Sequence, residues 1–239
     1  MNAEEAKDIP ESVFADDDGS ADARLAQSLI RHRRGKAPLA DVVDALSYAR
    51  VLVPIIASGD MRHVGEHGLE QDAVASTGVV AVELADGRRA LPVFTDTDAL
   101  AAWKPEARPV PVEGPRAALA AVAEQWSALV VNPAMEATII PRPALWALAQ
   151  GNPWQPAVID GVVADDVRDA LISAAMAEES IRDAACESGA DAEVTVVLSV
   201  TEGLTAAELH AVVARVQERL GESPVVAERV DSLQLRVQN

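Results

Sequence analysis

The chain has 239 residues, with 20 Lys and Arg against 38 Asp and Glu and a formal net charge of −18. This length can bury a core without a disulfide or a metal ion, and the single cysteine, Cys186, excludes an internal disulfide. So acidic a chain repels phosphate backbones, and no apolar stretch is long enough for a membrane helix. We therefore expect neither nucleic acid nor a membrane as a partner.

The N-terminal segment MNAEEAKDIPESVFADDDGS is acidic and rich in small residues. It lacks the positively charged start and the apolar centre of a signal peptide. We therefore predict an acidic flexible tail over residues 1–20 and a cytoplasmic location.

The first predicted helix follows this tail. Asp22 fits its N-cap and Gly35 its end. Leu25, Leu29 and Ile30 recur at helical spacing, so we predict that they form its buried face.

A basic cluster, Arg31-His32-Arg33-Arg34-Gly35-Lys36, lies at the end of this helix. Cations in a last turn are stabilised by the negative end of the helix dipole. That is the structural interpretation. An anion-binding or partner-binding site is the alternative, and the sequence leaves it open.

A second helix is expected from Pro38, because proline is favoured in a first turn and apolar residues follow at helical spacing. The segment RVLVPIIAS is typical of a strand, and Pro54 places it at a sheet edge or bulge. A polar loop over residues 58–77 comes next. The segments GVVAVEL and ALPVF then form a hairpin, because Asp86-Gly87 between them is a strong turn signal.

The turn Thr95-Asp96-Thr97-Asp98 connects this hairpin to a helix that reaches Trp103. We interpret Thr95 as the N-cap, with Asp98 three residues later completing the capping pattern. Both aspartates place negative charge near the positive end of the helix. The alternative is a binding site, but a hard cation needs more oxygen ligands than this turn supplies.

The rest of the first half alternates again between strands and helices. RPVPVEG is predicted as an edge strand, a helix begins at Pro115, and SALVVNPA is a buried strand that ends at Asn132-Pro133. A last helix runs from Pro143 to Gln150. The segment GNPWQPAVIDG is rich in Gly and Pro, so we place a linker at residues 152–160.

The second half repeats the mixture of helices and strands. A helix is predicted over residues 165–179, with strands over 180–186 and 192–200. Thr205 and Glu208 form a capping box for a further helix, and SLQLRVQ alternates as a half-buried strand. The sequence thus predicts an α+β fold of two small domains, each a mixed sheet with helices packed on it, over residues 21–151 and 161–239.

The order of these segments resembles the SseB family, the enhanced serine sensitivity proteins. In the first half the matching segments are ALSYARVLVPI, GVVAVEL, RRALPVFTDTDALAAW and ALVVNPA. In the second half DDVRDAL, AEVTVVLSV and RVDSLQLRV resemble the C-terminal domain of the family. The resemblance implies a two-domain α/β protein, and it defines no catalytic residues and no cofactor. We therefore interpret the matching residues as structural, and they are Pro54, Phe94, Thr95, Trp103, Asn132 and Pro133.

One histidine pair has the spacing of a zinc site. His63 and His67 are four residues apart and would share one face of a helix. Gly65 and Gly68 weaken such a helix, however, and Val64 stands where metalloproteases have a glutamate. We expect no metal and no cofactor.

No catalytic motif is present either. The sequence has no Gly-x-Ser-x-Gly elbow, no Gly-x-Gly-x-x-Gly loop and no Walker pattern. We interpret Cys186 as an inert residue of the second core.

We expect a non-enzymatic cytoplasmic protein that binds another protein, at the cleft between the domains or at a sheet edge near Pro54 or Pro109. The net charge favours a basic partner. The alternative is an enzyme or small-ligand binder whose site lies at the inter-domain cleft, with Thr95, Asp96 and Asn132 at strand ends. A secreted effector is a further alternative that nothing in the N-terminal sequence supports.

Overall fold

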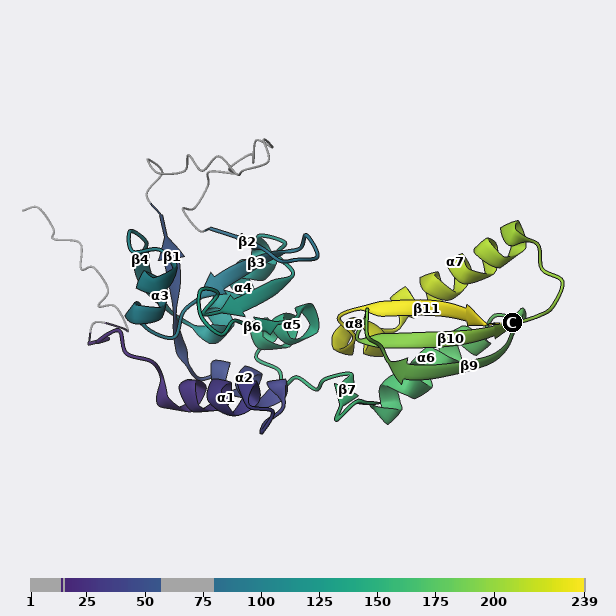
Figure 1. The fold of residues 1–239 in the computed structure, drawn as a ribbon, viewed down its shortest axis with the longest axis horizontal. Helices are drawn as coiled ribbons and strands as arrows, with labels where there is room; N and C mark the ends of the chain where they lie inside the picture. Colours follow the sequence, from purple (N-terminus) through teal and green to yellow (C-terminus); the bar gives the residue numbers. More distant parts are fainter. Residues whose placement is uncertain (1–13, 15, 57–79, 239) are drawn as a thin grey trace, which may run out of the picture.

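The structure is a computed structural model that describes residues 14, 16–56 and 80–238. Helices and strands are interspersed along the described chain, and its two larger sheets are mixed, which confirms the predicted α+β class (Figure 1). Within these ranges, no helix combines the length and the apolar character that crossing a membrane requires.

A mixed four-stranded sheet organises the N-terminal half. Its strand order is β2 (Val82–Glu83), β3 (Arg89–Val93), β5 (Ala128–Val131) and β6 (Thr138–Ile140). β3 and β5 are parallel, and the two outer pairs are antiparallel. The predicted hairpin is confirmed, because β2 and β3 are joined through Gly87, which has the positive φ of 81° that such turns require.

Four helices pack against this sheet. They are α1 (Ala23–Arg33), α2 (Leu39–Leu46), α4 (Gly114–Ala123) and α5 (Arg142–Gln150). Their buried residues form one hydrophobic cluster with alternate residues of β3, β5 and β6. α1 contributes Leu25 and Leu29 to this cluster.

Local signals set the ends of these helices as predicted. Asp22 caps α1 by accepting a hydrogen bond from the backbone N–H of Leu25, and Gly151 ends α5 in the left-handed region. The prediction for Ile30 is wrong, because its side chain is 48% exposed. One position beyond Leu29 turns about 100° around the helix, which carries Ile30 off the buried face.

The strands β1 (Arg50–Ile55) and β4 (Arg108–Glu113) form an antiparallel ribbon in which Pro54 lies opposite Pro109. Of the residues described, only Phe94 adds a further bridge to this ribbon, and this agrees with the predicted edge position of Pro54. The helix α3 (Thr97–Trp103) packs beside it.

A three-stranded mixed sheet forms the centre of the C-terminal half. Its order is β11 (Leu233–Gln238), β10 (Val194–Val200) and β9 (Ile181–Ser188), with β10 parallel to β11 and antiparallel to β9. Its hydrophobic cluster draws only on residues after Gln155, so the two halves have separate clusters.

Three helices accompany this sheet, namely α6 (Asp165–Met176), α7 (Ala206–Glu222) and α8 (Pro224–Arg229). The predicted capping box is confirmed, since the side chains of Thr205 and Glu208 each bond to the backbone N–H of the other. The sequence did not predict α8.

The segment predicted as a linker is partly ordered into a hairpin. β7 (Val158–Ile159) pairs with β8 (Val162–Val163), and the two turn residues, Asp160 and Gly161, both have positive φ. Two left-handed residues in succession are typical of a type I′ turn. Ala157 is fully buried in the second cluster, so the last residues of the predicted linker pack with the C-terminal half.

Candidate functional site

The three residues proposed from the sequence as a binding site lie together at the ends of β3 and β5. The backbone N–H of Thr95 donates to Asn132 Oδ1 (3.0 Å), and Asn132 Nδ2 donates to Thr95 Oγ1 (2.9 Å). The hydroxyl of Thr95 then donates to Asp96 Oδ2 (2.7 Å). Because β3 and β5 are parallel, their carboxyl ends meet at one edge of the sheet, and this brings together residues that are 37 positions apart.

The capping assignment within this turn was wrong by one residue. The N-cap of α3 is Asp96, whose Oδ1 accepts a hydrogen bond from the backbone N–H of Ala99 (2.8 Å). Thr95 is buried, and its hydroxyl is already engaged by Asn132 and Asp96. Because Asn132, at the end of β5, engages Thr95, Asp96 is the residue that caps α3.

An arginine ties this turn to the chain before α1. Arg50 donates to the carbonyl oxygen of Thr95 (2.9 Å) and to that of Ser20 (2.6 Å), and it also forms an ion pair with Asp17. The last residues of the predicted tail are therefore attached to β1 and to the turn. The hydroxyl, the backbone N–H and the carbonyl oxygen of Thr95 thus all have partners within the protein. A ligand-binding role for Thr95, Asp96 and Asn132 stays a prediction.

The contacts between the two halves involve other residues. Arg88 forms an ion pair with Asp231 (2.9 Å), and the backbone N–H of Arg142 donates to the same carboxylate (3.2 Å). A groove of about 340 Å³ between α5 and α8 is lined by Trp146 and Trp154, among others. Thr95, Asp96 and Asn132 do not line it, so the structure does not bring the three predicted residues to this junction.

The remaining candidates from the sequence are the histidine pair and Cys186. His63 and His67 lie outside the described residues. Residues 14, 16–56 and 80–238 contain no group of three or more His, Cys, Asp or Glu side chains that could hold a metal. Burial raises the pKa of the Cys186 thiol to about 11, which keeps it protonated and a poor nucleophile.

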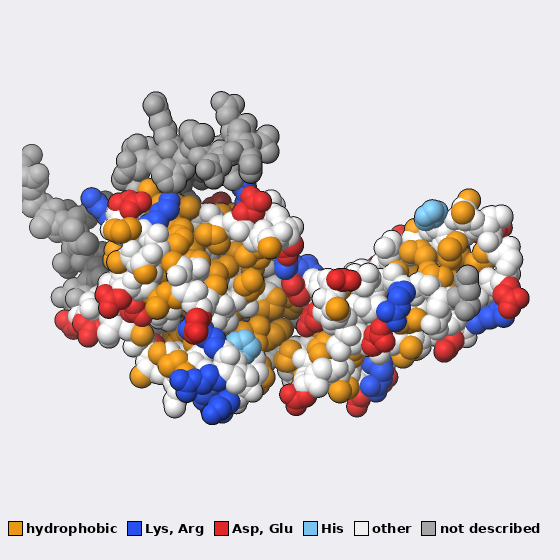
Figure 2. Space-filling model, in the orientation of Figure 1, with side chains coloured by type: hydrophobic (Ala, Val, Ile, Leu, Met, Phe, Trp, Pro, Cys, Tyr) orange, Lys and Arg blue, Asp and Glu red, His pale blue; other side chains and the backbone are white. Residues whose placement is uncertain are grey.

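The basic cluster at the end of α1 behaves differently from these candidates. Arg31, Arg34 and Lys36 are exposed, and within the residues that the structure describes they make no ion pair and no side-chain hydrogen bond. Figure 2 shows Lys and Arg side chains gathered over the α1 and α2 region, at the lower edge of the N-terminal half. Residues 23–40 contain no Asp or Glu at all, although the whole chain carries a net charge of −18.

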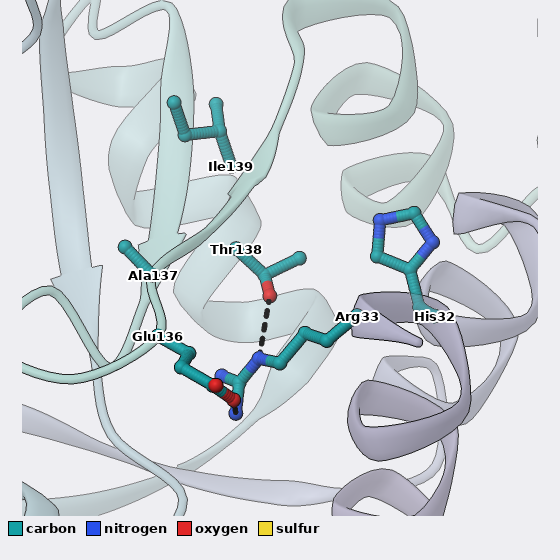
Figure 3. Close-up of a pocket in the computed structure, with 6 residues that line it drawn as sticks. All are labelled: His32, Arg33, Glu136, Ala137, Thr138 and Ile139. Carbon is teal, nitrogen blue, oxygen red and sulfur yellow. Dashed lines mark hydrogen bonds and ion pairs between the residues drawn. The ribbon is translucent and has the colours of Figure 1, made fainter. Parts of the chain in front are cut away.

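Beside this cluster lies a groove of about 540 Å³, here called the α1–β6 groove (Figure 3). His32 and Arg33 of α1 line one side, and residues 136–139 line the other. Thr138 points toward Arg33, whereas Ile139 points away from it, as successive residues of a strand do (Figure 3).

Arg33 is incompletely paired within the groove. Its Nε lies 3.4 Å from Thr138 Oγ1, and its Nη1 lies 3.5 Å from Glu136 Oε2. Its Nη2 is buried and has no hydrogen-bond partner among the described residues. Both contacts are at the long limit of hydrogen bonding, so Nε and Nη1 are weakly engaged, whereas the buried Nη2 is closed to an acceptor from outside the chain.

The free edge of β6 forms the floor of this site. Among the strands that the structure describes, only β5 pairs with β6, and the opposite edge of β6 has no partner strand. Ile139 is 46% exposed there. Thr138 and Ile140 are buried, so Ile139 is the residue of β6 at which an extended chain can reach main-chain donors and acceptors of this edge.

Sequence reasoning missed β6, and therefore the groove. The strand has only three residues, Thr138-Ile139-Ile140, and it follows a loop without alternating hydrophobicity. The signal that could have revealed it is the run of β-branched residues directly before Pro141.

Comparison with models of known protein families gives a match over the N-terminal half. The family model described as the SseB protein N-terminal domain matches residues 25–147, a range that includes both sides of the α1–β6 groove. No curated protein and no solved structure matches the chain. Residues 148–239 lie outside the matched range. Since the match covers half of the sequence, the chain belongs to the SseB family.

Proposed function

We propose that this chain is a non-enzymatic protein-binding module and that the α1–β6 groove is its binding site. The observation that carries the proposal is the outer edge of β6, which pairs with no strand among the described residues and lies beside an open groove, with Ile139 exposed. Partner chains bind such edges by adding a strand, because main-chain hydrogen bonds supply affinity and side-chain pockets supply specificity.

The neighbouring groups support this assignment. The sheet behind β6 is backed by four packed helices, so the edge is presented by a rigid core. Ile139 supplies apolar area, and Arg33 supplies weakly engaged donors, Nε and Nη1, on the other face of the strand. Rigid presentation lowers the entropy cost of binding.

The proposal extends to the location and the C-terminal half of the chain. We assign the binding activity to the cytoplasm, and fractionation of the host cell tests this assignment. We also assign residues 161–239 to a second domain, because this half has a separate hydrophobic cluster. We assign this domain to the SseB C-terminal type because DDVRDAL, AEVTVVLSV and RVDSLQLRV resemble that domain of the family.

Quantitative co-purification from the native host tests the binding site. The full chain is compared with Ile139→Asp, which places a charge on the edge strand β6. It is also compared with Leu119→Asp, which places the same charge on α4 at a residue that is 58% exposed. We expect at least one protein that co-purifies with the wild type and with Leu119→Asp to be lost from Ile139→Asp. Identical protein sets from both variants, at equal thermal stability, would refute the assignment of the groove.

A further inference from the structure

The geometry points to an extended acidic peptide as the occupant of the α1–β6 groove, with its carboxylate side chains facing Arg33 and its main chain paired with β6. This inference rests on the proposed function, since it names the partner segment for the same groove. It differs from the basic partner that the net charge favours, because the charge around the groove has the opposite sign.

Charge complementarity is the first reason. The segment that flanks the groove, residues 23–40, has basic residues and no acidic ones. Arg31, Arg34 and Lys36 have no anionic partner in the described part of the chain. Exposed unpaired cations attract a negatively charged segment and raise its association rate.

The state of Arg33 is the second reason. Its side chain is only 21% exposed, so water reaches it poorly, yet both of its contacts are long and Nη2 has no partner among the residues described. Because Nη2 is buried, a peptide carboxylate reaches this guanidinium at Nη1, where the contact with Glu136 is long and Glu136 itself is 80% exposed. Hydrogen bonds between two charged groups are among the stronger ones in proteins, so a peptide carboxylate can replace Glu136 at Nη1.

The strand geometry sets the pattern of the peptide. Thr138 faces Arg33, and Ile139 faces the opposite side of the sheet (Figure 3). A strand added beside β6 alternates in the same way, so every second side chain lies near Arg33 and the ones between lie near Ile139. The expected ligand is an extended segment in which Asp or Glu alternates with apolar residues.

Glu136 gives the inference a variant that should gain affinity. Its carboxylate lies 3.5 Å from Arg33 Nη1 and is 80% exposed, so it competes weakly with a peptide carboxylate for the same guanidinium. Replacing Glu136 by glutamine removes the charge that competes for Arg33, and it also removes the repulsion between Glu136 and a peptide carboxylate. A misfolded variant would not bind more tightly, and this separates recognition from a loss of structure.

The experiment selects a random phage-displayed peptide library on the full-length protein and then measures the best peptide by calorimetry. We expect alternating acidic and apolar peptides, with about tenfold weaker binding to Arg33→Gln, tighter binding to Glu136→Gln and unchanged binding to Leu119→Asp. Binding should also weaken as salt is raised, because the exposed cations are screened.

Three results would overturn the inference, and they separate it from the proposed function. Selected peptides that depend on Ile139 but lack acidic residues would refute the acidic ligand and leave the groove as a binding site. The absence of any peptide that depends on Ile139 would refute the inference and count against the groove itself. A single-stranded oligonucleotide that displaces the peptide and depends equally on Arg33 would identify the basic surface as a nucleic-acid site instead.

Discussion

Replacement of Asn132 by alanine tests whether the Thr95 and Asn132 contact holds the ends of β3 and β5 together. The change removes the acceptor for the backbone N–H of Thr95 and the donor to its hydroxyl. Both groups are buried, so solvent does not replace the lost partner.

The expected cost has three components. A buried N–H left without a partner costs about 1–3 kcal/mol, and the lost hydrogen bond to the hydroxyl contributes about 1 kcal/mol. Asn132 also has φ of 53°, a left-handed conformation that asparagine tolerates and that costs alanine about 1 kcal/mol. Together these predict that the free energy of unfolding falls by about 3–5 kcal/mol.

Asn132→Gly is the matched control, because it loses the same two hydrogen bonds but suits the positive φ. It should be about 1 kcal/mol less destabilising than Asn132→Ala. Urea unfolding followed by tryptophan fluorescence and circular dichroism measures both values. A loss of less than about 1 kcal/mol for Asn132→Ala, or equal losses for the two variants, would show that the network does not have the structural role assigned to it.

Three further predictions concern single side chains. Arg215 and Arg219 hold the pKa of the buried Glu178 carboxyl at about 2, below its ordinary 4.5. The stabilisation by this ion pair is complete above about pH 4.5 and is lost as the pH falls toward 2. The urea midpoint of the wild type should therefore fall between these pH values, and it should fall less in Glu178→Gln. Equal pH dependence in both proteins would contradict the ion pair. The thiol pKa of Cys186 is raised to about 11, so Cys186 should react with iodoacetamide at neutral pH far more slowly than free cysteine. A time course followed by mass spectrometry measures this rate, and reaction as fast as that of free cysteine would show an accessible thiolate. Asp96→Ala should lower the free energy of unfolding by about 1 kcal/mol through loss of the α3 cap, whereas no change in urea unfolding would place the cap elsewhere.

The sequence predicts those features that depend on neighbouring residues. Asp22, Asp86-Gly87 and the Thr205 to Glu208 box act within a few positions of the chain, and the structure has each of them where the local pattern placed it. The turn at Thr95 is different, because it offers two adjacent capping residues. Asn132, 37 positions away, engages Thr95 and leaves Asp96 to cap the helix.

The α1–β6 groove could not be predicted for the same reason. It forms where Arg33 meets Thr138, a contact between residues 105 positions apart. The basic cluster was visible in the sequence, and the alternative of an anion or partner site was open there. What the sequence lacked was the short strand opposite it, because a run of three residues is too brief for a periodic pattern.

The net charge of the chain differs in sign from the charge of residues 23–40, which flank this groove. A value of −18 favours basic partners when it is taken as an average over the molecule. Opposite charges are screened over about 10 Å at moderate salt, so a ligand in the groove responds to the nearby cations rather than to the distant carboxylates. Local charge therefore determines the partner expected at each surface.

Site-specific photo-cross-linking in the native host tests the central claim most directly. The photoreactive residue p-benzoylphenylalanine is placed at position 139 on the free edge of β6 and, as a control, at position 119 on α4. We predict discrete protein adducts from position 139 that are absent from position 119 and that decline when Arg33 is also replaced by glutamine. The same adducts from both positions, or none from position 139, would contradict the α1–β6 groove as the binding site of this protein.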